Sequence, residues 1–274
     1  MLRCKNFLFD LSRPLVMGIV NVTPDSFSDG GLHASTAAAI AHARRLIADG
    51  ADTLDIGGES TRPGAAAVST QDELDRVLPV IEGLHDISVP ISIDTWKPQV
   101  MRAALIAGAS MVNDINALQE EGTLAAVAAS GAAVCLMHKQ GVPHTMQQQP
   151  HYTDVIAEVS AFLSDRIAAA EAAGIARDRI VIDPGFGFGK TLAHNLDLLR
   201  ELETFRSLGV PILAGLSRKS MLGAITGRDV DERTTASVVA ALLAVQRGAA
   251  IVRVHDVRET VDALKVWDAI RKTD

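Results

Sequence analysis

Eight apolar runs of strand length recur along the chain, and stretches with helical spacing lie between them. Runs that are apolar at nearly every position are typical of parallel strands that helices cover on both faces. The predicted strands are Leu15–Val20, Thr53–Ile56, Pro90–Ile93, Met111–Val112, Ala133–Met137, Ile180–Ile182, Pro211–Ala214 and Ile251–Val254.

The intervening segments carry apolar residues at intervals of three and four, which predicts amphipathic helices. Ser35 is a candidate N-cap of a helix that carries Ile40, Ala43 and Ile47 and that Gly50 would end. Further helices are predicted over residues 72–85, 153–173, 192–199 and 257–270.

Alternation of strands and helices predicts the α/β class and favours one closed (β/α)8 TIM barrel, which needs about 250 residues. The chain has 274 residues, and no Pro/Ser-rich linker or block of charge divides it. We therefore predict a single domain over residues 1–274, with residues 1–13 as an N-terminal lead-in. An open, doubly wound sheet is the alternative fold.

Polar residues follow every predicted strand. In a TIM barrel these positions converge on the carboxyl-terminal mouth, where the active sites of this fold lie. One polar strand end alone could be structural, but a polar residue after all eight runs indicates a site. The residues concerned are Asn21, Asp55, Asp94, Asn113, Asp114, His138, Asp183, the stretch 217–220, Arg253 and His255.

Alternation of side chains along a strand places Arg253 and His255 on one face. Together with Lys219 they could concentrate positive charge at one point, although a structural ion pair is the plain alternative for Arg253.

A second group could form a polar floor for a flat heterocycle. Asp94, Asn113 and Asp183 all end strands. Carboxylates accept hydrogen bonds from ring N–H groups, and an amide both donates and accepts. Met137 and Phe188 could supply apolar contact with a ring, or could simply belong to the core.

The stretch DPGFGFGKT, from Asp183 to Thr191, differs from the nucleotide-binding P-loop motif at one position. The position of its first glycine holds Pro184, which has no N–H group to offer a phosphate. The dinucleotide fingerprint G-x-G-x-x-G fails as well, because Lys190 occupies the place of its last glycine. The glycines therefore serve another purpose.

Two connections at the predicted mouth, residues 21–31 and 57–64, are long and rich in turn residues. Loops of this kind can close over a substrate and exclude water. The alternative is a surface connection without a role in binding.

The formal net charge of −7 argues against a general nucleic-acid or acidic-membrane binder, but leaves an anionic small molecule possible. Of the two cysteines, Cys135 lies in a predicted strand and reads as a buried, inert thiol. The apolar N-terminal stretch is too short for a signal peptide or a membrane span. We expect a cytoplasmic protein.

Eight motifs occur in the order that is typical of the dihydropteroate synthase family, and the chain resembles that family from about Met17 to its C-terminus. The motifs are NVTPDSFSDGG, DIGGESTRPG, SIDTWKPQV, VNDINAL, LMHKQGVPHTMQ, DPGFGFGKT, GLSRKSMLG and VRVHDV. The resemblance implies a TIM barrel that joins para-aminobenzoate to 7,8-dihydropterin-6-ylmethyl diphosphate in folate biosynthesis. It also implies competition by sulfonamides and a homodimer.

The resemblance further implies a role for individual residues, with Asp94, Lys219, Arg253 and His255 as the catalytic set. The pterin would be held by Asp94, Asn113, Asp183 and Lys219, in a pocket lined by Ile115, Met137, Phe188 and Gly215. The diphosphate would be held by Thr61, Arg62, Arg253 and His255, and its Mg²⁺ by Asn21. The aminobenzoate would be framed by Arg62, Pro63, Lys219 and Ser220.

Two other functions remain open at this point. A methyltetrahydrofolate-dependent methyltransferase has a similar acid-and-amide floor but no diphosphate to bind, which would leave Arg62, Lys219 and Arg253 without a purpose. A catalytically silent pterin-binding homologue is the second alternative.

Overall fold

The computed structural model describes residues 1–23, 31–60, 67–141 and 145–271. Its centre is a closed barrel of eight parallel strands in chain order, in which the last strand pairs with the first. The predicted TIM barrel is confirmed, and the open sheet is excluded. The barrel strands are β3 (Leu15–Asn21), β4 (Thr53–Gly57), β5 (Ile91–Asp94), β6 (Met111–Asp114), β7 (Ala133–Met137), β8 (Ile180–Asp183), β9 (Ile212–Ala214) and β10 (Ala249–Val254).

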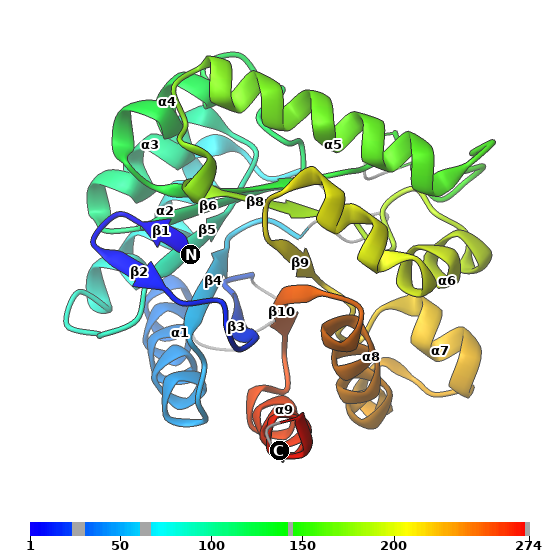
Figure 1. The fold of residues 1–274 in the computed structure, drawn as a ribbon. Helices are drawn as coiled ribbons and strands as arrows, with labels where there is room; N and C mark the ends of the chain where they lie inside the picture. The colour runs from blue at the N-terminus through cyan, green and yellow to red at the C-terminus, as the bar shows by residue number, and fades with distance from the viewer. Residues whose placement is uncertain (24–30, 61–66, 142–144, 272–274) are drawn as a thin grey trace.

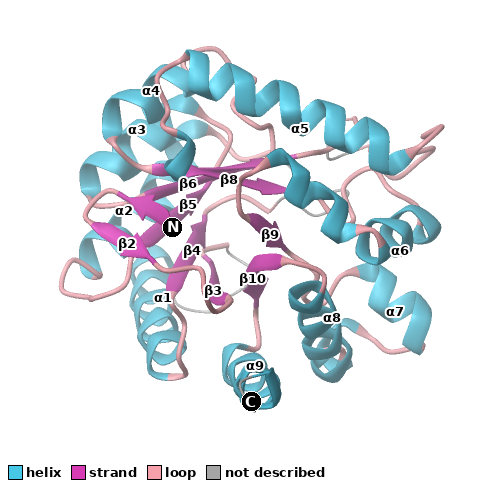
Figure 2. Cartoon of the chain, in the orientation of Figure 1, coloured by secondary structure: helices cyan, strands magenta, loops and turns pink. Residues whose placement is uncertain are grey.

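Helices surround the barrel on its outside (Figure 1, Figure 2). They are α1 (Gly31–Ala48), α2 (Thr70–Gly83), α3 (Pro98–Ala107), α4 (Thr123–Ser130), α5 (Val155–Ala172), α6 (Leu192–Arg200), α7 (Ser220–Thr226), α8 (Thr234–Gln246) and α9 (Val257–Arg271), with 3-10 turns at Arg177–Arg179, Leu202–Leu208 and Val230–Glu232. Each predicted strand lies in the barrel, and no predicted end is displaced by more than two residues.

Capping side chains explain where α2 and α6 begin, whereas the predicted cap of the first helix is wrong. Ser69 caps α2 by accepting the backbone N–H of Asp72, and Thr191 caps α6 in a capping box with His194. The prediction that Ser35 caps the first helix is wrong, because α1 begins at Gly31 and Ser35 lies inside it. No proline interrupts residues 31–35, so the helix extends upstream of the serine.

Apolar side chains fill the barrel interior. Met17, Met111, Val181 and Ile251 form one buried cluster there, and a larger cluster lies between the strands and the helices. Cys135 belongs to the interior cluster and is fully buried, which raises the pKa of its thiol. The prediction of a buried thiol is confirmed, and the raised pKa agrees with an inert one.

The N-terminal lead-in forms a β-hairpin, which the sequence analysis did not predict. Strands β1 (Leu2–Cys4) and β2 (Phe7–Phe9) pair antiparallel, with Leu2 opposite Phe9. Leu2 and Cys4 are buried in the interior cluster beside Leu15 and Ala133, the first residues of two barrel strands. The hairpin therefore covers the amino-terminal end of the barrel (Figure 1).

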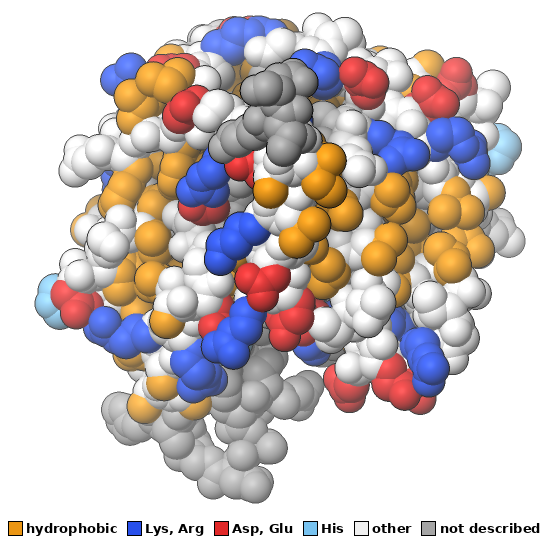
Figure 3. Space-filling view, turned by 60° about the horizontal axis from the view of Figure 1, so that its bottom comes forward, with side chains coloured by type: hydrophobic (Ala, Val, Ile, Leu, Met, Phe, Trp, Pro, Cys, Tyr) orange, Lys and Arg blue, Asp and Glu red, His pale blue; other side chains and the backbone are white. Residues whose placement is uncertain are grey.

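Charged side chains of both signs are interspersed with apolar ones on the face shown in Figure 3. That face carries no broad patch of a single sign among the described residues. Within the described chain, no helix is long and apolar enough to cross a membrane.

The hairpin predicts a stability effect at a distance from the mouth. Leu2→Ala removes a side chain that is 1% exposed and should lower the free energy of unfolding by about 2–4 kcal/mol, because a cavity replaces it. Leu8→Ala in the same hairpin is the control, since Leu8 is 54% exposed and should change stability little. Urea denaturation measures the free energy of unfolding of both variants. Equal losses of stability would contradict the packing of Leu2 against the amino-terminal end of the barrel.

Candidate active site

The barrel register brings the predicted polar floor together at the carboxyl-terminal mouth. Asp94 of β5 is the Cα partner of Asn113 in β6, and Met137 of β7 is the partner of Asp183 in β8. Asp94, Asn113 and Asp183 are each less than 10% exposed. Parallel strands of a barrel end on the same rim, so these three acceptor groups face one site.

Arg253 connects this floor across the barrel. Its Nη2 donates to Asp94 Oδ2 at 2.8 Å, and its Nε donates to Asp55 Oδ2 at 2.5 Å. Asn113 Nδ2 donates to the same oxygen of Asp55 at 2.9 Å. Asp55 was identified as a polar residue at a strand end but was not assigned to the site. The structure makes it the residue that orients both Arg253 and Asn113.

Burial sets the electrostatics of the site. Desolvation raises the pKa of Asp94 to about 7, although the charge of Arg253 opposes the shift. Burial also raises the pKa of Asp183, and a backbone N–H from Gly185 offsets part of this. Burial acts to lower the pKa of Arg253, but the nearby carboxylates of Asp55 and Asp94 outweigh it, so the pKa is raised overall. The mouth thus holds more carboxylate than it can keep ionised at low cost.

Two carboxylate oxygens of this group have no hydrogen-bond donor in the described chain. Asp55 Oδ1 and Asp94 Oδ1 are buried and accept no hydrogen bond from any described residue. A buried acceptor without a donor is costly, so such atoms call for a partner. A heterocycle that presents N–H groups at the mouth could donate to Asp94 Oδ1, whereas Asp55 is fully buried beneath it in β4.

The glycine-rich loop after β8 passes too close to its neighbours for side chains. Gly185 has φ +73°, and a Cβ there would collide with the carbonyl oxygen of His138. Gly189 has φ +62°, and a Cβ there would collide with the carbonyl oxygen of Gln140. Glycine alone fits both constraints. The loop is glycine-rich because it packs on the residues after β7.

Lys190, which gives this loop its P-loop appearance, points into the protein. Its Nζ lies 2.9 Å from His138 Nδ1, 3.0 Å from Gly185 O and 3.1 Å from Phe188 O. Burial lowers the pKa of Lys190 to about 7 and the pKa of His138 to about 3, so His138 is a neutral acceptor. Lys190 holds the loop carbonyls together, consistent with the exclusion of a nucleotide site.

The predicted cationic residues lie on the side of β9 and β10. Lys219 Nζ is 4.2 Å from the centre of the Phe188 ring, a cation–π distance. His255 Nδ1 is 2.9 Å from Ser217 Oγ, which fixes the ring orientation. Ser220 is the first residue of α7. Gly215 lies beside the floor, since a Cβ there would be 3.8 Å from Asp183 Oδ2.

An apolar wall completes the site. Ile115, Met137 and Phe188, which were predicted to line a ring pocket, pack in one small buried cluster. The cluster also contains Met146, and Trp96 packs against it. Sequence reasoning missed both, because neither follows a strand directly.

Two of the polar strand-end residues turn away from the mouth. Asp114 accepts the backbone N–H groups of Asn116 and Leu118, each at 2.7 Å, and so stabilises a tight turn. His138 supports Lys190 as described. Alternation explains both outcomes, since each follows a residue, Asn113 or Met137, that faces the site.

Asn21 ends β3 and pairs with Gly57, so it lies on the same rim. Thr61, Arg62 and Pro63 lie outside the described residues.

The chain matches a family model, curated sequences and solved structures over nearly its whole length. Residues 17–255 match the family model for pterin binding enzymes. A dihydropteroate synthase of Escherichia coli (strain K12) is 52% identical over 261 residues, covering 95% of this chain and 93% of that protein. The Xanthomonas albilineans dihydropteroate synthase with 4-aminobenzoic acid has a TM-score of 0.94 and 56% identity, covering 99% and 98% of the two chains. Its complex with 7,8-dihydropteroate has a TM-score of 0.89 and 50% identity, with coverage of 99% and 98%.

The raised pKa of Asp94 predicts how stability varies with pH. The folded protein binds this proton more tightly than the unfolded chain does, so the contribution is present below pH 3.8 and is lost as pH rises towards about 7. Asp94→Asn removes this loss. The difference in stability between variant and parent should therefore shift in favour of the variant, by roughly 1 kcal/mol or more, as the pH is raised from 4.5 to 8, whether or not loss of the Arg253 partner makes the variant less stable at both pH values.

Denaturant unfolding at both pH values measures this gain. Glu121→Gln, at an exposed carboxylate, is the matched control and should show no such trend. A stability difference between Asp94→Asn and the parent that stays constant with pH would contradict the assignment.

Proposed function

The chain belongs to the pterin-binding enzyme family and has dihydropteroate synthase activity, and from this premise we propose which of its residues carry the reaction. The reaction condenses para-aminobenzoate with 7,8-dihydropterin-6-ylmethyl diphosphate, forming dihydropteroate in folate biosynthesis and releasing diphosphate. The family and activity predicted from the motifs are thereby confirmed, and the methyltransferase and the silent homologue are set aside.

The observation that carries the residue assignment is the buried acid-and-amide floor. In our proposal Asp94, Asn113 and Asp183 bind the N–H and amino groups of the pterin, with Asp94 Oδ1 as an acceptor that the protein itself does not satisfy. Ile115, Met137 and Phe188 contact the ring, and Gly215 leaves room beside Asp183. An acceptor-rich, apolar-walled pocket suits a flat heterocycle that is rich in donors.

The hard step is cleavage of the C–O bond between the pterin methylene and the diphosphate. The electron pair leaves with the diphosphate, and the methylene becomes a cation that the electron-rich pterin stabilises by resonance. Asp94 is the proposed counter-charge to this cation. Its raised pKa fits the role, because a cation placed beside it favours the ionised carboxylate that burial alone disfavours.

Negative charge develops on the departing diphosphate, and hydrogen-bond donors near the diphosphate can stabilise it. Arg253 uses two of its five N–H groups on Asp55 and Asp94, and the geometry supports the use of others on a polyanion. His255, oriented by Ser217, is the second proposed donor, with Thr61 and Arg62 assigned by resemblance. Holding Arg253 between two carboxylates sets its guanidinium before substrate arrives.

We further propose Mg²⁺ on the diphosphate, with the Asn21 carboxamide oxygen as the protein ligand. Among the described residues no group of three or more His, Cys, Asp or Glu gathers to form a protein cage. A single protein oxygen at the rim fits this ion, which prefers oxygen ligands and commonly takes most of them from water and substrate phosphates. When bound, the ion would neutralise charge on the leaving group.

The nucleophile needs no strong base. An aryl amine is neutral near pH 7, so its nitrogen can attack the methylene directly, and its proton leaves afterwards to water or diphosphate. Lys219 and Ser220, with Arg62 and Pro63, are the proposed frame for the aminobenzoate, whose carboxylate a lysine can pair with.

A homodimer in the cytoplasm is the proposed setting. Ile225 on α7 and Val239 on α8 are more than half exposed on adjoining helices, which supports association. Both cysteines are unpaired, which suits a reducing compartment. Sedimentation that gave the monomer mass of 29.0 kDa, or cell fractionation that placed the protein elsewhere, would contradict the respective proposal.

Diphosphate release from the purified protein with both substrates and Mg²⁺ tests the function, and Asp94→Asn tests the mechanism. We expect the variant to lose roughly 10²–10³ in kcat, because one well-placed electrostatic stabiliser is removed, with a much smaller loss of affinity for the pterin diphosphate. Equal losses in both quantities would remove Asp94 from the chemical step.

Asp183→Ala tests the floor. The variant should lose most of its affinity for a pterin, because donors on the ring are left unpaired in a buried site. Calorimetry with a pterin that lacks the diphosphate measures this. Asp114→Asn is the matched control, since its carboxylate serves a turn, and unchanged affinity in Asp183→Ala would contradict the assignment.

A further inference from the structure

A buried ionic network lies beside the mouth and takes no part in the proposed chemistry. Its centre is Lys97, the residue before α3, three positions after Asp94. Lys97 Nζ donates to Glu59 Oε2 at 2.9 Å, to Glu73 Oε2 at 2.6 Å and to the carbonyl oxygen of Val68 at 2.7 Å. These three acceptors satisfy the three N–H groups of the ammonium.

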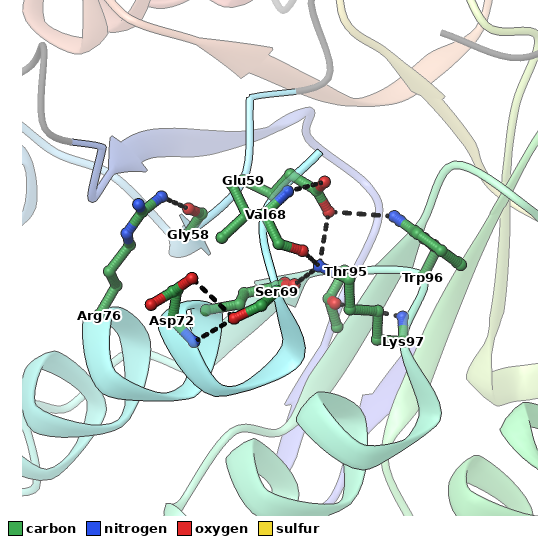
Figure 4. Close-up of polar contacts among 10 residues, drawn as sticks. Gly58, Glu59, Val68, Ser69, Asp72, Arg76, Thr95, Trp96 and Lys97 are labelled. Atoms are coloured by element: carbon green, nitrogen blue, oxygen red, sulfur yellow. Dashed lines mark hydrogen bonds and ion pairs between the residues drawn. The ribbon is translucent and has the colours of Figure 1, made fainter. Parts of the chain in front are cut away.

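The acceptors come from both ends of the connection between β4 and α2. Glu59 follows the end of β4, whereas Val68 precedes the N-cap residue Ser69 of α2. Glu59 also joins these ends directly, since its Oε1 accepts the backbone N–H of Val68 at 2.9 Å. Figure 4 shows Glu59 and Val68 close together, with Trp96 and Lys97, which follow β5 in the chain, across from them.

The same network reaches the ring pocket and the floor. Trp96 Nε1 donates to Glu59 Oε2 at 3.1 Å, and the Trp96 side chain packs against the apolar wall of the site. Gly57, two residues before Glu59, is the Cα partner of Asp94. Glu59 therefore connects the loop stems with the wall and the strand that carry the proposed pterin contacts.

Burial makes this arrangement more demanding than a surface ion pair. The side chains of Lys97, Glu59 and Glu73 are 8%, 10% and 0% exposed. Ions that are removed from water stabilise a fold only when geometry is good and every donor is used, and apolar residues often do as well. Packing alone thus does not explain why three charges occupy this position.

We propose that Lys97, Glu59 and Glu73 are positioning residues for the condensation. They hold both stems of the β4–α2 connection, and the indole of Trp96, in a fixed place beside Asp94. This inference rests on the proposed function, because the connection contains Thr61 and Arg62, which are assigned there to the diphosphate. A displacement of about 1 Å at such a site can cost about 10²-fold in rate.

Glu59→Gln and Lys97→Met test the proposal by steady-state kinetics and calorimetry. We expect kcat/KM for para-aminobenzoate to fall about 10- to 100-fold per folded molecule, while affinity for a pterin without diphosphate stays within about threefold. The double variant should lose little more than either single variant, because the two residues act as one unit. If Lys97→Met does not fold, Glu59→Gln carries the test, together with faster amide exchange at Val68.

Arg179→Met is the matched control. Arg179 is another buried cation, but it donates to the carbonyl oxygens of Ala132 and Val127 near the start of β7, away from the mouth. It should lose stability and keep kcat/KM. Activity in Glu59→Gln and Lys97→Met within twofold of the parent, or an equal kinetic loss in Arg179→Met, would overturn the positioning role. Absence of diphosphate release from the parent protein would overturn the proposed function itself, and this inference with it.

Discussion

One guanidinium, that of Arg253, organises the mouth of the barrel. It joins the last strand to β4 and β5 through Asp55 and Asp94, residues 198 and 159 positions away in the chain. Removing one partner of a buried pair leaves an uncompensated charge, which is far more costly than the pair is worth as a whole. The orientation of Asn113, set by Asp55, and the protonation of Asp94 both depend on this cation.

Two buried lysines organise the connections that follow the barrel strands. Lys190 gathers carbonyl oxygens of the loop after β8, and Lys97 gathers acceptors from the connection after β4. Where the backbone becomes irregular after a strand, no neighbouring strand or helical turn donates hydrogen bonds to its carbonyl oxygens. A buried polar group without a partner is costly. An ammonium with three donors meets this need in little space. Lys190, which gives its loop the appearance of a phosphate site, thus holds the loop backbone instead of contacting a ligand.

Much of this site follows from periodicity. Strand ends on one rim and side chains that alternate along each strand were enough to predict that Asp94, Asn113, Asp183 and Arg253 come together. The same rule separates Asn113 from Asp114, which is buried, turns away from the mouth and stabilises a turn. What could not be predicted depends on partners that are distant in sequence. Asp55 orients the site through its hydrogen bond with Arg253, and Lys97 through its ion pairs with Glu59 and Glu73. No sequence pattern around Asp55 or Lys97 indicates these partners.

Local signals also failed at two other places. The strands of the N-terminal hairpin have three residues each, which is too short to show an alternation of apolar and polar positions. Lys5 between them adopts a left-handed φ of 51°, which is uncommon for a lysine and could not be predicted from its residue type. Ser35 has the chemistry of a cap but stands in a segment that is helical before it. Residue type gives a preference at such positions, and the surrounding chain decides the outcome.

The hairpin has a consequence for how the molecule is made. Leu2 and Cys4 are buried in one cluster with Ala133, Val181 and Ile251, which follow them far along the chain and are synthesised much later. Contacts of such long sequence separation form only after the intervening chain exists. The hairpin therefore cannot dock until strands from the middle and the end of the barrel are present, so closure of the amino-terminal end belongs to the late stages of folding.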